Sequence, residues 1–387
     1  MSMKILINGK LIIPDKYGKF TVKENLVMTF NDKIQSITSI ENVDLSAFDE
    51  VIDAAGKYVS PGFINIHIHG CAGFDTMDAE FNSLTAMQKF LPATGVTAFL
   101  PTTMTMPFEL VTKALRVIRE GMKSEVGARV LGANVEGPYI SKKFKGAQDE
   151  KFIKVANFED IAEFVDVVRI ITLAPEELKD YNFVKDCHNN NIIVSIGHTA
   201  ADYDTAIDAI NNHGVRHITH LFNAQTGLHH RKPGVVGAAL DSDAVVELIC
   251  DNVHVHPVVQ RLVWKVKPSE EIVLITDSLR ACGLSDGTYA LGGQEVNVKG
   301  ELATLADGTL AGSVAKMNHV VRNFMLNAKI GIAEAVELVA KSPAVELKAY
   351  DYLGSLEVGK AADFLLLDGD CEIHSAFIRG KLCHNHP

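Results

Sequence analysis

Short apolar runs recur along the middle of the chain, and segments of helical length separate them. Eight of these runs have strand character, at residues 62–70, 95–102, 128–137, 167–176, 191–199, 215–224, 244–254 and 271–278. Nearly continuous apolar strands that alternate with helices are typical of a parallel sheet covered on both faces. Eight of them predict an α/β fold with a closed (β/α)8, TIM-like barrel over residues 59–354. A doubly wound Rossmann sheet is the alternative, which is weakened because no GxGxxG pattern follows the first strand.

The segments between the runs have the periodicity of amphipathic helices. In residues 201–215, Asp202 is a suitable N-cap, Ala206 and Ile210 share one face, and Gly214 ends the predicted helix. After the eighth run, residues 289–313 are rich in glycine and alternate between apolar and polar positions. This pattern predicts a small β insertion before the last helices.

The sequence pattern differs at both ends of the chain, where short strands and turns replace the alternation of strands and helices. This pattern predicts that residues 1–58 and 355–387 form one small, discontinuous β-sandwich domain, which packs beside the barrel and away from its open rim. Asn8 and Gly9 separate two short apolar runs, and this pair predicts a hairpin turn rather than a signal peptide.

Composition and net charge indicate which kinds of molecule this protein is unsuited to bind. The 387 residues are 47% hydrophobic and 22% charged, with a formal net charge of −11, and the sequence pI is about 5.7. This balance argues against nucleic acid or an acidic membrane surface as the main partner. Apolar runs are too short to span a bilayer. The six cysteines are scattered without a CxxC pair, so a reducing, cytoplasmic location is the simplest expectation.

Two histidines stand inside the first apolar run. Ile64, Ile66 and Ile68 alternate with Asn65, His67 and His69, so a strand places the two histidines on one side, next to a Gly-rich turn. Two metal ligands require this arrangement, although two hydrogen-bonded core histidines would give the same pattern.

Polar residues also end the other predicted strands. A single histidine at such a place is more often structural than a ligand, but the carboxyl ends of barrel strands all meet at one rim. The residues concerned are His67 and His69 of the first run, Glu136 of the third, His198 of the fifth, His220 of the sixth, His254 of the seventh and Asp277 of the eighth. Imidazoles and a carboxylate suit Zn²⁺, Fe²⁺ or Mn²⁺. Asp277 is the candidate general base, and its alternative role is to cap the next helix.

A loop after the sixth run gathers hydrogen-bond donors. Its members are Asn223, His229, His230, Arg231 and Lys232, and Arg231 offers a planar fork that suits a phosphate. In an acidic protein, a local cationic patch at the rim favours a substrate with an anionic end, while an ordinary solvated loop fits the pattern equally well.

Taken in order, these motifs resemble the amidohydrolase superfamily and, within it, the family of N-acetylglucosamine-6-phosphate deacetylases. The resemblance runs from end to end of the chain. It rests on PGFINIHIHG, VEGPYISKKFKGAQ, SIGHTAADYD, THLFNA, GLHHRKPGVVGAAL, DNVHVHP, ITDS, LAGS and GSLEVGKAADFLLLD. Several consecutive motifs are much more specific than the HxH pair alone.

The resemblance implies a set of roles. A main metal would be held by Glu136, His198 and His220, and a second by His67 and His69 with Glu136 as a bridge, so each subunit would hold one or two metals. The catalytic aspartate falls on Asp277. Substrate contacts fall on Ala147, Asn223, Ala224, Arg231, His254 and the loop Ala311, Gly312 and Ser313. The resemblance also implies a homodimer in which Arg231 reaches into the neighbouring subunit's site.

The resemblance thus implies removal of an acetyl group from a phosphorylated amino sugar. Two alternatives stay open: another deacylase or a deaminase of the superfamily that acts on a small anionic substrate, and a non-catalytic barrel that serves as a scaffold. Scaffold relatives usually lose their ligands, and this chain retains all six ligand and base residues.

Overall fold

The structure is a computed structural model that describes residues 3–386, and its centre is the expected parallel barrel. Neighbouring strands pair in the order β6, β9, β11, β12, β13, β14, β15 and β16, and the short β10 adds to β9. Their bounds are β6 Phe63–Ile68, β9 Val96–Thr103, β10 Arg129–Val130, β11 Ala133–Tyr139, β12 Val168–Leu173, β13 Ile193–Ile196, β14 His217–Ile218, β15 Val245–Ile249 and β16 Ile272–Ile275. The main-chain N–H of Asp277 donates to the carbonyl of His67 at 3.0 Å, which joins the last strand's end to the first.

Two predicted runs are shorter as strands than expected. The run 128–137 is divided between β10 and β11, because Gly132 (φ +144°) breaks the strand where its backbone passes Val167 and Arg169 closely. Only two residues of the run 215–224 pair as a strand. His220, Phe222 and Ala224 all have positive φ, so the chain leaves the extended conformation as soon as it reaches the rim.

Helices cover the outside of the barrel, as the alternation predicts. Their bounds are α1 Phe81–Phe90, α2 Phe108–Gly121, α3 Asn182–Asn189, α4 Tyr203–His213, α5 Gly234–Leu240, α6 Pro257–Val266, α7 Met317–Ala328, α8 Ile332–Val336 and α9 Ser342–Glu346. The helix predicted in residues 201–215 is confirmed: the Asp202 carboxylate accepts from the N–H of Thr205, and Gly214 ends the helix at φ +72°. Between β11 and β12, the described chain makes short 3₁₀ turns at 142–144, 150–152, 158–160 and 162–164.

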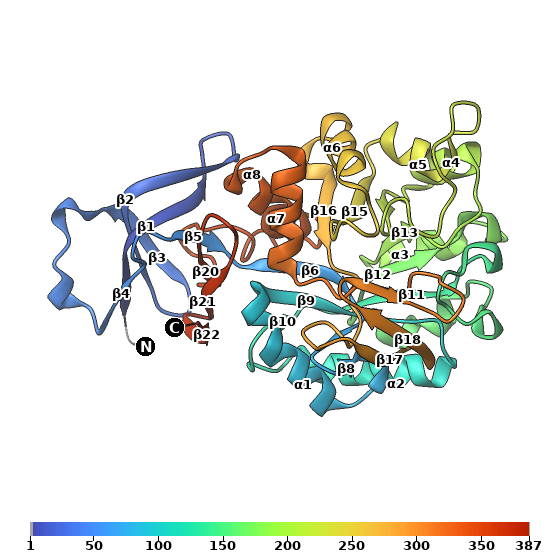
Figure 1. Ribbon diagram of the computed structural model, residues 1–387, viewed down its shortest axis with the longest axis horizontal. Helices are drawn as coiled ribbons and strands as arrows, with labels where there is room; N and C mark the ends of the chain where they lie inside the picture. The colour runs from blue at the N-terminus through green and yellow to red at the C-terminus, as the bar shows by residue number, and fades with distance from the viewer. Residues whose placement is uncertain (1–2, 387) are drawn as a thin grey trace.

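The two chain ends share one eight-stranded sheet beside the barrel, at the left of Figure 1, where blue and red strands meet. Its strands are β1 Lys4–Pro14, β2 Phe20–Phe30, β3 Ile34–Ser39, β4 Glu50–Asp53, β5 Tyr58–Pro61, β20 Phe364–Leu367, β21 Ile373–Ile378 and β22 Lys381–Asn385. The antiparallel pairing of β5 with β20 joins the N-terminal strands to the C-terminal strands. The exact domain limits at 58/59 and 354/355 stay a prediction.

The hairpin predicted at Asn8 and Gly9 is wrong. The strand β1 continues through both residues, and the turn to β2 comes later, between Pro14 and Phe20. Asn8 has a φ of +56°, which produces an irregular step in the β1–β2 pairing instead of a reversal. Gly9 is needed for a different reason: a Cβ there would lie 2.4 Å from a methyl group of Val59 on β5.

The predicted β insertion is a three-stranded antiparallel sheet. It comprises β17 Gly287–Leu291, β18 Gln294–Lys299 and β19 Leu302–Thr304, and a separate two-stranded unit pairs β7 Gly70–Cys71 with β8 Phe74–Asp75. Gln294 of β18 donates a hydrogen bond to the carbonyl of Ala147, so the insertion contacts the chain that follows β11. No helix within residues 3–386 combines the length and apolar character needed to cross a membrane.

The N-cap of α4 can be tested directly. We expect Asp202→Ala to lower the free energy of unfolding by about 1 kcal/mol, because the N–H of Thr205 loses its acceptor. Urea unfolding of the variant checks this. Asp204→Ala, in the first turn of the same helix, is the matched control, and an equal loss in both variants would contradict the capping role.

Candidate metal centre

Site residues of three strands occupy the same position relative to the strand end. His198, His220 and Asp277 each lie two residues beyond the last residue of β13, β14 and β16. Their φ angles are +48°, +29° and +48°, in a region that residues with a Cβ seldom adopt. Such strain persists only where the surrounding structure enforces it, and it is commonest at functional sites. The turn directs all three side chains toward the barrel mouth.

Glu136 is the centre of the cluster. One of its oxygens, Oε1, lies 3.1 Å from Nε2 of His198 and 2.9 Å from Nε2 of His220. The other, Oε2, lies 3.3 Å from Nε2 of His69. His67 approaches Oε1 at 3.5 Å through Nε2. All four imidazoles therefore present Nε2 to one buried carboxylate.

Three of the four imidazoles are oriented from behind by their second nitrogen, whereas Nδ1 of His220 is buried without a hydrogen-bond partner. The Nδ1 atom of His69 lies 3.2 Å from the Thr102 carbonyl, and that of His198 lies 3.0 Å from the Phe144 carbonyl. Carbonyl partners accept a proton from Nδ1, so Nε2 carries the lone pair that faces the cluster. This is the arrangement that metal-ligating histidines show in proteins.

Two groups of three ligand atoms result, His67–His69–Glu136 and Glu136–His198–His220, each within 4.8 Å of one another. The Nε2 atoms of His198 and His220 are only 3.1 Å apart. Nε2 of His67 and Oδ1 of Asp277 are buried without a hydrogen-bond partner. Buried lone pairs that face one another are unfavourable unless a cation lies between them, so the donor set fits divalent transition metals.

Asp277 closes the cluster on the side of β16. Its Oδ1 lies 3.1 Å from Nε2 of His69 and 3.5 Å from Nε2 of His67. Burial alone would lower the pKa of His69, but the carboxylates of Asp277 and Glu136 outweigh it and raise that pKa to about 10. Burial would likewise raise the pKa of Asp277, yet the two histidines hold it below its ordinary value. The site therefore attracts positive charge, whether protons or metal ions.

A buried glutamate on β15 supports both halves of the cluster from below. Oε2 of Glu247 lies 2.9 Å from Nδ1 of His67 and accepts from the main-chain N–H of His220 at 3.0 Å. Its Oε1 lies 3.2 Å from Nε2 of His217, whose Nδ1 lies 2.9 Å from Oε1 of Glu346. Burial lowers the pKa of His217, but the two glutamates raise it to about 9. The Glu247 carboxylate thus fixes both the ring of His67 and the main chain of His220.

The cluster opens into a cavity of about 280 Å³. Among the predicted substrate residues, Ala147, Asn223, Ala224, His254 and Gly312 line this cavity. His254 is held by Asp251, whose Oδ2 lies 2.7 Å from its Nδ1. The insertion contributes Leu291 from β17 and the following residues Thr309 and Leu310 to the wall. The cavity is therefore bounded by barrel loops and insertion together.

Three predicted substrate residues lie elsewhere in this single chain. Arg231 is exposed, with its guanidinium 2.6 Å from the ring of His230, and it does not line the cavity. Ala311 and Ser313 are buried behind the rim. The main-chain N–H of Ser313 donates to the carbonyl of Asp277 at 2.8 Å, so this residue braces the Asp277 turn. The functional roles of all these residues stay predictions.

Sequence reasoning missed two residues that contact the cluster. Gln148 donates from Nε2 to Oε2 of Glu136 at 2.6 Å, while its own oxygen accepts from the N–H of Thr105 at 2.7 Å. Gln148 is the last residue of the motif VEGPYISKKFKGAQ, and the resemblance carried by that motif assigned no role to this residue. Glu247 was missed because it lies in the middle of an apolar strand, although a lone acid in such a strand is itself a signal.

Comparisons with known proteins agree with this geometry. The model of the amidohydrolase family matches residues 58–383. An N-acetylglucosamine-6-phosphate deacetylase of Bacillus subtilis (strain 168) is 38% identical over 99% of this chain and 98% of its own length. An N-acetylgalactosamine-6-phosphate deacetylase of Escherichia coli O157:H7 is 35% identical over 89% of this chain and 92% of its own. The crystal structure of an N-acetylglucosamine-6-phosphate deacetylase from Pasteurella multocida superposes with a TM-score of 0.92, at 31% identity, over 98% of this chain and 99% of that one.

Glu247 provides a test of the supporting hydrogen bonds. We expect Glu247→Leu to lower metal affinity by about 10- to 100-fold, because the His67 ring and the His220 N–H lose their acceptor. Glu247→Gln retains an oxygen for both donors and should stay within about threefold of the original affinity. Equilibrium dialysis with Zn²⁺ measures this.

Thr172→Val is the matched control for these variants. It removes a buried hydrogen bond to Thr219 inside the same barrel without touching a candidate ligand. We expect the control to lower thermal stability and leave metal content unchanged. Equal metal affinity in Glu247→Leu and the original chain would contradict the supporting role.

Proposed function

This chain is a member of the amidohydrolase family, and on that basis we propose that it is a metal-dependent hydrolase that deacetylates N-acetylglucosamine 6-phosphate. The products are acetate and glucosamine 6-phosphate, as in amino-sugar catabolism. One observation carries the proposal: Glu136, four imidazoles and Asp277 meet at the floor of a cavity whose wall contains the predicted sugar-binding residues. The deacetylases that match over nearly the whole chain support the same reaction.

The metal would be held by residues that the cluster already orients. Glu136, His198 and His220 form the main group, while His67 and His69 with Glu136 form a second, which accommodates one or two ions of Zn²⁺, Fe²⁺ or Mn²⁺. When bound, such a metal polarises the amide carbonyl and lowers the pKa of a water molecule toward neutrality.

Asp277 performs the proton transfers. Its carboxylate takes a proton from the attacking water as the new C–O bond forms at the amide carbon. It then gives this proton to the nitrogen as the C–N bond breaks, which releases the amine and acetate. The low pKa of Asp277 keeps it ionised and ready to accept the proton at neutral pH. His254, held by Asp251, is placed to contact the substrate from the neighbouring loop.

The phosphate end of the substrate lies away from the reacting amide. Asn223, Ala224, His254, Ala147 and Gly312 all line the cavity, and we assign the first three to the phosphate end and the last two to the sugar. Arg231 is exposed on its loop, so we propose a homodimer in which it binds the phosphate in the partner's site. Binding energy from the phosphate then positions the amide for attack. The free state of the six cysteines supports a cytoplasmic setting.

The identity of the sugar has a specific second candidate. An N-acetylgalactosamine-6-phosphate deacetylase matches this chain at 35% identity. Both sugars carry the same acetamide and phosphate groups, so the metal cluster and Asp277 act identically on either. Other superfamily activities, such as deamination, and a non-catalytic scaffold are the remaining alternatives, and the assay below includes them.

The first prediction concerns the substrate. We expect acetate release from N-acetylglucosamine 6-phosphate by protein that is loaded with Zn²⁺, Mn²⁺ or Fe²⁺, and none from metal-stripped protein. N-acetylgalactosamine 6-phosphate, unphosphorylated N-acetylglucosamine and a set of aminated bases serve as comparisons. Ammonia release without acetate would indicate a deaminase, and the absence of both bound metal and hydrolysis would indicate a scaffold.

The second prediction concerns the general base. We expect Asp277→Asn to lower kcat by about 10²- to 10⁴-fold, because the amide cannot accept the water's proton. Substrate binding, measured by calorimetry, should change little. Asp204→Asn, an exposed change on α4, is the matched control. Full turnover by Asp277→Asn would overturn the mechanism while leaving the metal cluster intact.

A further inference from the structure

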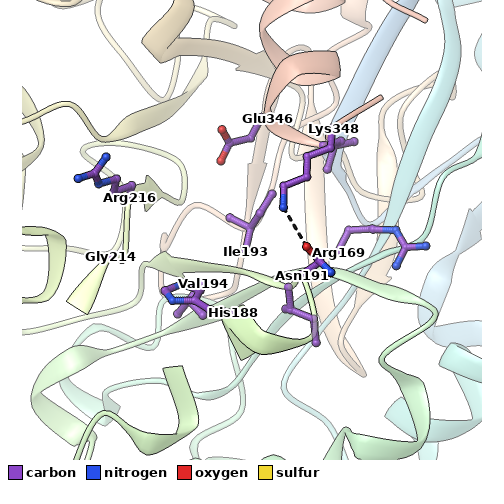
Figure 2. Close-up of a pocket in the computed structure, with 11 residues that line it drawn as sticks. Arg169, His188, Asn191, Ile193, Val194, Gly214, Arg216, Glu346 and Lys348 are labelled. Carbon is purple, nitrogen blue, oxygen red and sulfur yellow. Dashed lines mark hydrogen bonds between the residues drawn. The ribbon is translucent and has the colours of Figure 1, made fainter. Parts of the chain in front are cut away.

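The N-terminal end of the barrel, opposite the metal centre, contains an unusual group of arginines. A pocket of about 410 Å³ lies there between β13 and the C-terminal helices. In Figure 2, Lys348 reaches Asn191 across this pocket, while Arg169 extends its guanidinium away from the other labelled residues. Arg169 also lines an adjoining cavity of about 270 Å³, together with Arg129 and Arg379. Three guanidinium-bearing residues thus border one small cavity.

These arginines come from three separate parts of the chain. Arg129 begins β10, Arg169 is the second residue of β12, and Arg379 follows β21 of the small sheet. The cavity therefore lies at the seam between the barrel and the sheet formed by the chain ends. Leu131, Leu347 and Tyr352 complete much of its wall, which leaves room for an organic group.

Arg129 is the only one of the three with a carboxylate partner among the described residues. Its guanidinium binds both oxygens of Asp363, at 2.6 and 3.0 Å. Oδ1 of Asp363 also accepts from the main-chain N–H of Arg379 at 2.7 Å. Both oxygens of this carboxylate are thus bound by Arg129, and the carboxylate affects the Arg379 guanidinium through its charge, as Glu125 does, without a side-chain hydrogen bond.

The side chains of Arg169 and Arg379 have only carbonyl oxygens as partners in the part of the chain that the structure describes. Arg169 donates to the carbonyls of Val168 and Asp166 at 3.3 and 2.9 Å, and Arg379 donates to that of Ser124 at 3.4 Å. The nearby carboxylate of Asp166 is bound by Arg119 at 2.6 Å. Burial lowers the pKa of Arg169, and burial together with the like charge of Arg129 lowers that of Arg379.

We propose that the cavity lined by Arg129, Arg169 and Arg379 binds a phosphate dianion, either free or as the monoester group of a small metabolite. Two guanidinium groups that make no hydrogen bond to a carboxylate among the described residues match the charge of about −1.5 to −2 that a phosphate monoester carries at pH 7. The planar forks of arginine bind phosphate oxygens in pairs. A bound phosphate would also join the small sheet to the barrel, since Arg379 and Arg169 belong to different sides of the seam.

This site is distinct from the proposed active site and does not depend on the reaction assigned to it. The metal cluster lies beyond the carboxyl ends of the strands, whereas Arg129 and Arg169 lie at the beginning of theirs. The next pocket along the seam contains charges of both signs: Lys33 and Lys381 line it together with Asp32 and Glu125, and Lys381 is paired with Glu125 at 3.4 Å.

The first test uses the unmodified, metal-loaded protein. Phenylglyoxal modifies arginines, and mass spectrometry of peptides gives the rate at each position. We expect inorganic phosphate, at ten times its dissociation constant, to slow modification of Arg169 and Arg379 by about tenfold. Arg216 lines the neighbouring pocket, is paired with Asp243 at 3.0 Å, and should be unaffected. Chloride at equal ionic strength controls for screening.

The second test uses variants and thermal unfolding. We expect saturating phosphate, at one hundred times its dissociation constant, to raise the Tm of the original chain and of Arg216→Gln by about 4 °C. The double variant Arg169→Gln/Arg379→Gln should lose most of this rise, while its kcat and KM for the proposed substrate stay unchanged. Without phosphate the double variant should be at least as stable as the original chain, because like charges have been removed.

Repeating the phenylglyoxal experiment with glucosamine 6-phosphate distinguishes free phosphate from the monoester group of a metabolite. Protection of both arginines at lower concentrations than inorganic phosphate would assign the site to a phosphorylated metabolite, and equal protection would assign it to phosphate itself. Unchanged modification rates at Arg169 and Arg379, or equal slowing at Arg216, would overturn the proposal. So would an undiminished Tm rise in the folded double variant. None of these results bears on the deacetylase reaction, which the acetate assay measures separately.

Discussion

The structure of the barrel mouth depends on one buried carboxylate, that of Glu136, and on the four imidazoles that face it. Moving a carboxylate out of water is costly unless charges and hydrogen bonds replace the lost solvent. Here Gln148 donates a hydrogen bond to Glu136, the imidazole Nε2 lone pairs leave the place beside it for a cation, and three of the rings are held from behind by carbonyls and by Glu247. These supports fix the carboxylate and the rings, while Nε2 of His67 and Oδ1 of Asp277 stay buried without a hydrogen-bond partner. This constraint explains why all four rings present Nε2 to Glu136.

The same constraint links the metal centre to the far end of the barrel. Glu247 contacts His217, and His217 contacts Glu346 at the end of α9, so a continuous polar column crosses the barrel interior. The two barrel ends nevertheless differ in charge. Carboxylates dominate the mouth, where a cation is expected, while arginines gather at the opposite end beside the small sheet. The net charge of the whole chain conceals this separation.

Much of the barrel and its metal cluster could be predicted from the sequence, because both depend on local patterns. Alternation placed His67 and His69 on one side of the first predicted strand, and a Gly-rich turn followed that strand. The hairpin at Asn8 and Gly9 failed since a positive φ in the Asn is compatible with an irregular step in a continuing strand. The three seam arginines were missed for another reason. Their importance depends on neighbours more than a hundred residues away, such as Asp363 for Arg129, which no local pattern reveals.

The backbone at the rim explains how a regular barrel produces an irregular site. A continuing strand would alternate its side chains between the interior and the helices, and residues beyond its end would diverge. At His198, His220 and Asp277 a positive φ turns the chain immediately after the strand, and hydrogen bonds to the carbonyls of all three hold that turn. The donors are the main-chain N–H groups of Ser141, Asn223 and Ser313, which lie on three different loops and keep the backbone in this strained conformation. The loops that border the cavity therefore also hold the ligands in place, so a change in the substrate wall is transmitted to the metal cluster through the main chain.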